Sequence, residues 1–226
     1  MIALLAQGLP ALLFGVSAAT ATAPPPSMIA ALREELPDAL AAAAPPDSLQ
    51  YAGPEGAFQL GVGEMDGAPP AEGLLVIRPA DKPVRVVFLG ESGGKSVRKT
   101  VKLPSDEAGE VSAQFVAFAE GKALGQIRGA SGSSVLVAWD GGKCEVVWSS
   151  EKGTQDSRWF ELEDLDGDHT REIVTYQRRS IDASAEDEFV RESQGAAPTE
   201  EASAVAVLKW NGGKWEKADK LLSARH

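Results

Sequence analysis

The amino-acid sequence predicts an all-β protein with a short helical segment before the strands. Three observations indicate this class. Runs rich in β-branched residues, such as 84–89 and 134–139, alternate with glycine-rich turns, one Gly-Gly-Lys turn occurs three times, and a short acidic motif precedes each of these turns. The 226 residues, 43% hydrophobic and 24% charged, are typical of a globular chain that buries a core without disulfides.

Charge and composition exclude several kinds of function. The formal net charge of −11 argues against nucleic acid and anionic membrane surfaces, because binding to either depends on Lys and Arg. Multivalent cations suit such a surface better. The single cysteine, Cys144, excludes an internal disulfide, and the only histidines, His169 and His226, are too few for a histidine-built zinc site.

Residues 1–23 have the pattern of a secretory signal peptide. No charged side chain occurs before Arg33, and the apolar stretches 2–5 and 9–16 are followed by small residues at 17–23. The uninterrupted apolar length is below the ~20 residues that a membrane span requires. We therefore expect a secreted, periplasmic or cell-surface protein that is not inserted in a membrane once the signal is removed.

The Pro/Ala-rich segment 24–47 is expected to contain a helix. Ser27 is the predicted N-cap, and Pro37 should kink or split the helix. Four apolar residues have the spacing of one helix face: Ile29, Leu32, Leu36 and Leu40.

The region 48–226 contains a degenerate internal repeat. The shared turn stands at 91–95, 139–143 and 210–214, where Asp-Gly and Asn-Gly pairs favour tight hairpins. Upstream of these turns, an acid is followed six positions later by Glu or Gln. These pairs are Asp66 with Glu72, Glu120 with Gln126, and Asp166 with Glu172.

The intervals between the acids, 54 and then 46 residues, suit a four-stranded propeller blade of roughly 45 residues. We therefore predict a propeller-like array of about three four-stranded blades, with a β-sandwich as the alternative. The expected units are 55–104, 105–152 and 153–222, and the third carries an acidic insertion at 178–203. Three blades leave an unprotected end, which the helix, the insertion or a second copy of the chain would cover, so a homo-oligomer is compatible with this architecture.

One loop has the composition of a metal site. Asp164, Asp166, Asp168 and Glu172 occupy relative positions 1, 3, 5 and 9 of a turn between two predicted strands. Carboxylates that converge without a counter-ion repel one another, and a hard divalent cation removes that cost. Calcium accepts six to eight oxygens, so the four carboxylates, the backbone carbonyl of Thr170 and water would satisfy it. The alternative is a solvated acidic hairpin without metal.

The stretch Asp164 to Ile173 resembles the D-x-D-G-D-G-x-x-[DE]-[IL] loop of FG-GAP and VCBS-type repeats, and is similar to the calcium loops in the β-propeller of integrin α subunits. The resemblance implies a propeller blade with one structural calcium held by the same five residues. His169 stands where that pattern has glycine. The earlier loops are degenerate, with Ala68 and Lys122 at the fifth position, so we expect one calcium ion and not three.

The function that follows is an exported calcium-binding module with a non-enzymatic binding or scaffolding role toward an unknown protein or glycan. The alternative is a secreted hydrolase or polysaccharide-active protein that uses Glu161, Glu163 or Asp187 as general acid and base. Gly90-Glu91-Ser92-Gly93-Gly94 matches a hydrolase nucleophile elbow, but 96–103 alternates like a strand where that motif needs a helix. We expect Cys144 and the five tryptophans to serve in packing.

Overall fold

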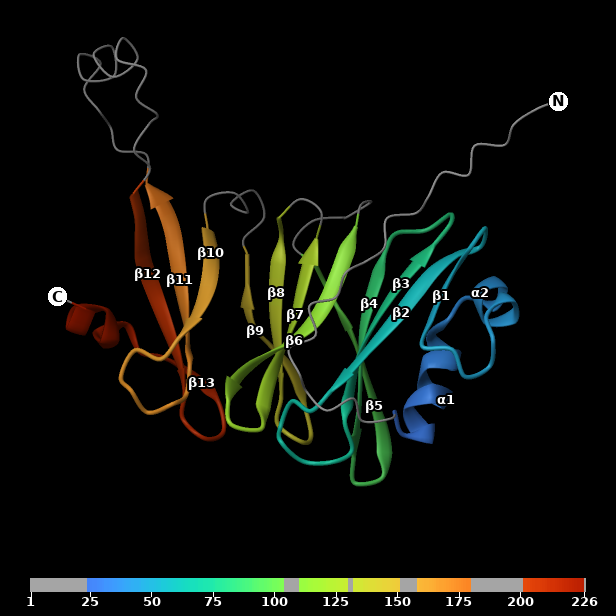
Figure 1. The fold of residues 1–226 in the computed structure, drawn as a ribbon, viewed down its shortest axis with the longest axis horizontal. Coiled ribbons are helices and arrows are strands. Elements are labelled where there is room, and N and C mark those ends of the chain that lie inside the picture. Colours follow the sequence, from blue (N-terminus) through green and yellow to red (C-terminus); the bar gives the residue numbers. More distant parts are fainter. Residues whose placement is uncertain (1–23, 104–109, 130–131, 151–157, 180–200, 226) are drawn as a thin grey trace, which may run out of the picture.

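Three antiparallel sheets stand side by side, and two short helices lie against the outer side of the first sheet (Figure 1). The computed structural model describes residues 24–103, 110–129, 132–150, 158–179 and 201–225. The expected all-β class is confirmed. The expected signal peptide, 1–23, lies outside the described residues.

The sheets occupy consecutive stretches of the chain. The first contains β1 (Gln50–Gly53), β2 (Gly56–Gly63), β3 (Glu72–Pro79), β4 (Arg85–Ser92) and β5 (Lys95–Val101). The second contains β6 (Val111–Ala119), β7 (Lys122–Gly129), β8 (Ser134–Trp139) and β9 (Cys144–Ser149). The third contains β10 (Arg158–Glu163), β11 (Glu172–Arg179), β12 (Glu201–Trp210) and β13 (Trp215–Lys217), and a 3-10 helix, η1 (Asp219–Arg225), follows it. In each sheet the strands pair in chain order.

Two details differ from the sequence prediction. The first sheet has five strands and not four, because β1 turns back on β2 and the ring of Tyr51 stacks on Phe58 at 6.3 Å. In the third sheet, β11 continues to Arg179 and β12 begins at Glu201, so strand pairing extends into both ends of the expected insertion 178–203. Residues 180–200 lie outside the described residues.

The expected Gly-Gly-Lys hairpins connect the last two strands of each sheet. Positive φ angles occur at Gly93 (57°), Gly94 (74°), Gly141 (82°) and Gly212 (87°), which a side chain would disfavour. Strand β5, and not a helix, follows the Ser92 turn, so the nucleophile-elbow interpretation is excluded. Because consecutive strands are antiparallel, the connections β2–β3, β6–β7 and β10–β11 lie at the same end of the stack as the hairpins (Figure 1).

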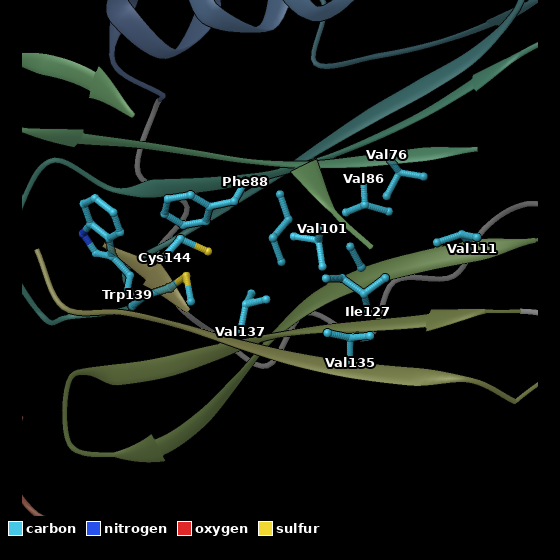
Figure 2. Close-up of a cluster of buried hydrophobic side chains, with 13 residues drawn as sticks. Val76, Val86, Phe88, Val101, Val111, Ile127, Val135, Val137, Trp139 and Cys144 are labelled. Carbon is cyan, nitrogen blue, oxygen red and sulfur yellow. The ribbon is translucent and has the colours of Figure 1, made fainter. Parts of the chain in front are cut away.

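The two faces of the second sheet pack into two different hydrophobic cores. Between the first and second sheets, Val86 and Phe88 of β4 face Val135 and Val137 of β8, and the ring of Trp139 packs on Phe88 at 5.0 Å (Figure 2). Thr175 of β11 belongs to the next interface, between the second and third sheets, where it accepts a hydrogen bond from Trp148 Nε1 at 2.9 Å.

That second interface is rich in aromatic side chains. Its buried members are Phe118, Leu124, Leu136 and Ile173, surrounded by Trp148, Phe160, Trp210 and Trp215. Four of the five tryptophans therefore pack between sheets, as expected, while Trp159 stacks on Tyr176 at 5.5 Å within the third sheet. Cys144 is buried, and burial raises the pKa of its thiol to about 11, which fits the expected packing role.

The N-terminal segment forms two helices, α1 (Pro26–Glu35) and α2 (Asp38–Ala43), separated at Pro37 as predicted. Leu32, Leu36 and Leu40 are buried against Leu75, Ile77, Val87 and Leu89 of the first sheet. Ser27 is not the N-cap, because the helix begins at Pro26. Its hydroxyl instead donates a hydrogen bond to Glu91 Oε2 at 2.9 Å. No helix in the described part of the chain has the length and apolar character to cross a membrane.

Gly125 of β7 tests how closely the first two sheets approach each other. A Cβ atom at this position would lie 2.8 Å from Leu74 Cδ1 of the first sheet, and 2.7 Å from Val137 Cγ2 of the neighbouring strand β8. We expect Gly125→Ala to lower the free energy of unfolding by about 1–3 kcal/mol in urea denaturation, because the two sheets must separate locally. Gly213→Ala is the matched control, since no atom lies within 4 Å of its Cβ position. Equal stability of the two variants would contradict this packing.

Candidate metal centre

The loop between β10 and β11 is folded around the carboxylate of Asp164. Its Oδ1 accepts a hydrogen bond from the Gly167 amide at 2.8 Å, and its Oδ2 accepts one from the His169 amide at 3.1 Å. Gly167 (φ 77°) and His169 (φ 67°) both adopt the left-handed conformation, and His169 is the only described residue other than glycine to do so. His169, which stands where the calcium-loop pattern has glycine, therefore still adopts the backbone conformation that glycine favours.

Glu172, the first residue of β11, is 0% exposed. Its Oε2 accepts a hydrogen bond from the Leu165 amide at 2.8 Å, while Oε1 is buried without a hydrogen-bond partner. Burial is the main cause that raises its pKa, and the negative charges of Asp166 and Asp168 add to the effect. An ionised carboxylate at this place therefore needs a nearby cation.

Three of the five expected ligand residues come together. Side-chain oxygens of Asp164, Asp166 and Glu172 all lie within 4.8 Å of one another, the only such group of three among the described residues. Asp168 is not part of this group of three, and its Oδ1 accepts a hydrogen bond from the Thr170 amide at 2.8 Å. The three acids together could hold a metal ion.

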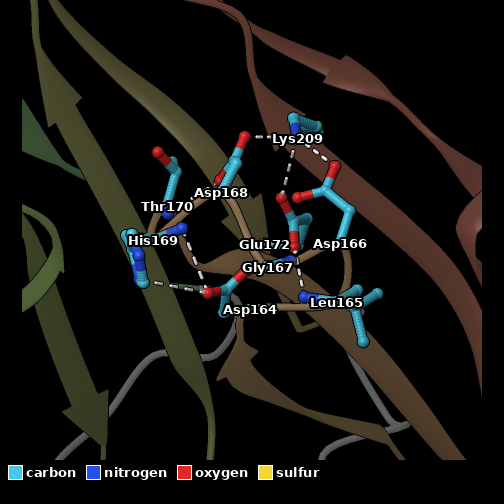
Figure 3. Close-up of polar contacts among 9 residues, drawn as sticks. All are labelled: Asp164, Leu165, Asp166, Gly167, Asp168, His169, Thr170, Glu172 and Lys209. Atoms are coloured by element: carbon cyan, nitrogen blue, oxygen red, sulfur yellow. Dashed lines mark hydrogen bonds and ion pairs between the residues drawn. The ribbon is translucent and has the colours of Figure 1, made fainter.

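Lys209, which the sequence did not single out, offsets part of the negative charge of the loop. Lys209 of β12 extends its ammonium among Asp166, Asp168 and Glu172 (Figure 3). The Nζ atom forms ion pairs with Asp166 and with Asp168, whose Oδ2 is 2.6 Å away. Its distance of 3.6 Å from Glu172 Oε1 is too long for a hydrogen bond. Hydrogen bonds to the two aspartates raise the pKa of Lys209, and its bond to Asp168 lowers the pKa of that carboxyl.

A signal for Lys209 was present in the sequence. It is the one charged residue in the apolar run 204–210, three positions before the first glycine of the hairpin turn. The position of Lys209 becomes clear only from the strand pairing. Ile173 of β11 pairs with Leu208 of β12, so the next residues along the two antiparallel strands, Glu172 and Lys209, lie opposite each other.

The first acidic loop repeats one element of this geometry. Glu72 is the first residue of β3, and its Oε2 accepts a hydrogen bond from the Met65 amide at 2.7 Å, just as Glu172 does from Leu165. Burial raises the pKa of Glu72 to about 7, and the charges of Asp66 and Glu64 contribute in the same direction.

The second unit does not share this geometry. The turn between β6 and β7 is tight, with Ala119 paired to Lys122, so there is no loop to close. Gln126 lies well inside β7 and pairs with Gln114, although its sequence spacing from the acid matches that of Glu72 and Glu172. Lys122, at the fifth position, donates a hydrogen bond to the backbone oxygen of Asp66 at 3.1 Å and so joins the first two sheets.

Two of the acids considered for hydrolysis are engaged with aromatic neighbours. Glu161 accepts a hydrogen bond from Trp159 Nε1 at 3.2 Å, and Glu163 accepts one from the Tyr176 hydroxyl. Asp187 lies outside the described residues.

Comparisons with known proteins do not identify the chain. No protein-family model, curated protein or solved structure matches it.

The raised pKa of Glu72 predicts a pH-dependent stability. Between its ordinary value of 4.5 and about 7, the folded chain holds a proton that the unfolded chain has lost. The free energy of unfolding should therefore fall as pH rises through this window, by at most about 3 kcal/mol from this group. Glu72→Gln should remove this part of the decline and make the protein more stable than wild type at pH 7.5.

Urea denaturation at pH 5 and pH 7.5 measures the effect. Asp81→Asn is the control, because it removes a negative charge from an exposed position at the opposite end of the first sheet. A Glu72→Gln variant with the pH dependence of the wild type would show that this carboxyl is not responsible.

Proposed function

We propose that this protein is an exported calcium-binding β-repeat module with a non-enzymatic binding or scaffolding role, and that its target is a protein or a glycan. The observation that carries the proposal is the buried Oε1 of Glu172, which has no hydrogen-bond partner and lies with oxygens of Asp164 and Asp166 within 4.8 Å.

The chemistry of these donors favours calcium. All three are carboxylates, which are the ligands that hard cations prefer, and calcium tolerates irregular sets of six to eight oxygens better than magnesium does. Asp168 and the carbonyl of Thr170 would complete the set once Lys209 has left the loop.

Lys209 sets the expected affinity. Calcium has to displace an ammonium that is already paired with Asp166 and Asp168, and this competition weakens binding. Displacement is feasible because the Lys209 side chain is 26% exposed and can turn toward solvent. We therefore expect a dissociation constant in the range of extracellular calcium modules, about 10⁻⁴–10⁻³ M.

The resemblance of Asp164–Ile173 to the FG-GAP and VCBS-type loop supports the same proposal, and so does the stack of four- and five-stranded antiparallel sheets. Export is supported by the signal-like composition of residues 1–23, and it would bring the loop into contact with extracellular calcium.

The hydrolase alternative receives little support at its expected residues, since Glu161 and Glu163 are hydrogen-bonded within their own sheet. Two other acids, Asp66 and Glu72, do line a shared cavity. The shape and lining of that cavity suit binding of a ligand better than hydrolysis.

Calcium titration by calorimetry tests the proposal. Asp166→Ala should abolish binding, because it removes a ligand and leaves Lys209 paired with Asp168. Lys209→Met should strengthen calcium binding at least tenfold, because the competing ammonium is gone. Calcium should also raise the melting temperature of Lys209→Met more than that of the wild type.

Lys214→Met is the matched control, since Lys214 lies on the adjacent hairpin and pairs with Glu216, away from the loop. Its calcium affinity should equal that of the wild type. A Lys209→Met protein that is folded but binds no calcium would show that the loop is a metal-free turn with a built-in counter-ion.

A further inference from the structure

A second acidic pocket lies between the first and second sheets, at the end of the stack that carries the hairpin turns. It has a volume of about 240 Å³, and its lining includes Asp66, Glu72, Glu91, Ser92, Trp139 and Gly141. The β2–β3 loop, the β4–β5 hairpin and the β8–β9 hairpin thus each contribute one wall.

Glu72 is the buried acid of this pocket. It is 1% exposed, and its carboxylate accepts the Met65 amide but no hydrogen bond from any described side chain. Asp66 is also anchored by backbone, since its Oδ1 accepts a hydrogen bond from the Ala68 amide at 3.0 Å. The other Asp66 oxygen, Oδ2, is near the β8–β9 hairpin, 3.2 Å from where a Cβ of Gly141 would be. Both carboxylates therefore keep capacity for a cationic partner.

The third sheet shows which group fits beside such acids. There, the residue opposite Glu172 on the neighbouring strand is Lys209, and its ammonium lies among Asp166, Asp168 and Glu172. In the first sheet, Gly73 pairs with Leu89, so the residue opposite Glu72 is Gly90. Gly90 and Lys209 also stand at the same distance from their Gly-Gly-Lys turns. The first loop thus has a glutamate and an aspartate at the same positions as the third loop, but no lysine on the neighbouring strand. The rings of Phe88 and Trp139 fill the space where a side chain of Gly90 would stand. The open space beside the two acids is therefore the cavity between the three turns.

A metal ion is a poor match for this pocket. Among the described residues, only the third loop brings three acid side chains within 4.8 Å of one another, and Ala68 replaces the fifth-position aspartate here. Calcium would need oxygens that converge at 2.3–2.6 Å, whereas these acids line a cavity large enough for several heavy atoms.

We propose that this pocket binds a primary ammonium group, either of a free alkyl amine or of a lysine side chain. The three N–H donors of an ammonium match Asp66, Glu72 and the Ser92 hydroxyl. Trp139 lines the same cavity, and its ring is held in place by packing on Phe88. The inference rests on the cavity and not on the calcium proposal, so the two can fail separately.

The test is titration of the ¹⁵N-labelled protein with cadaverine (1,5-diaminopentane) in 150 mM NaCl at pH 8, followed by NMR. The amides of Gly93, Gly94 and Gly141 should shift and saturate, since these residues line the cavity. Nα-acetyl-lysine methylamide, used in a second titration, reports binding of a lysine side chain. Saturable shifts with either probe support the proposal, and their relative affinities identify the source of the ammonium.

Two variants and one neutral probe make the test specific. Asp66→Asn and Glu72→Gln should each weaken cadaverine binding at least fivefold, whereas Asp166→Asn, the matched change in the third loop, should leave it unchanged. The uncharged 1,5-pentanediol should not bind. Asp66 is only partly buried, so its variant is informative even if Glu72→Gln alters folding.

Three results would overturn the proposal. The first is the absence of saturable shifts with both amines. The second is shifts of equal size with the diol. The third is cadaverine affinity that is the same in Asp66→Asn as in the wild type, which would indicate general attraction to an acidic surface.

Discussion

Val135, Leu136 and Val137 of β8 are all fully buried, although successive side chains of a strand point to opposite faces of its sheet. The second sheet must therefore be covered on both sides, and the first and third sheets provide the two covers. The first sheet has the same need, because Val86 and Phe88 face the second sheet while Val87 and Leu89 face the helices. Two-sided burial of apolar strands is the constraint from which the stacked arrangement follows.

Buried glutamates close two of the loops at one end of this stack. Glu72 and Glu172 each accept a hydrogen bond from a backbone amide seven residues earlier, which fixes where the loop leaves and re-enters the sheet. This role requires a carboxylate in a place with little water, and burial raises the pKa of both groups. The two sites differ in how the charge is compensated. In the third sheet Lys209 supplies an ammonium from the neighbouring strand, whereas in the first sheet Glu72 and Asp66 line a cavity.

The sequence predicted the strands and turns well, because their signals are local. Asp-Gly and Asn-Gly turns, β-branched runs and Pro37 act within a few residues of where they stand. The acidic loop was found for the same reason. The role of Lys209 was not predictable in this way, since it depends on the pairing of β11 with β12 across more than twenty intervening residues. Gln126 matches Glu72 and Glu172 in sequence spacing only, because equal spacing along the chain does not imply an equal position in a sheet when the loop lengths differ.

The pairing order has a consequence for how the chain folds. Every sheet is built from strands that are neighbours in sequence, so the hydrogen bonds of each sheet join segments that are close along the chain. The apolar faces between sheets are completed only when the next sheet has been made. Assembly can therefore proceed by successive addition, with α1, α2 and the first sheet as the initial platform and the third sheet docking last onto Leu136 and Phe118. Without the third sheet, the aromatic side of the second sheet would be open to water, and exposed apolar surface of this kind favours aggregation.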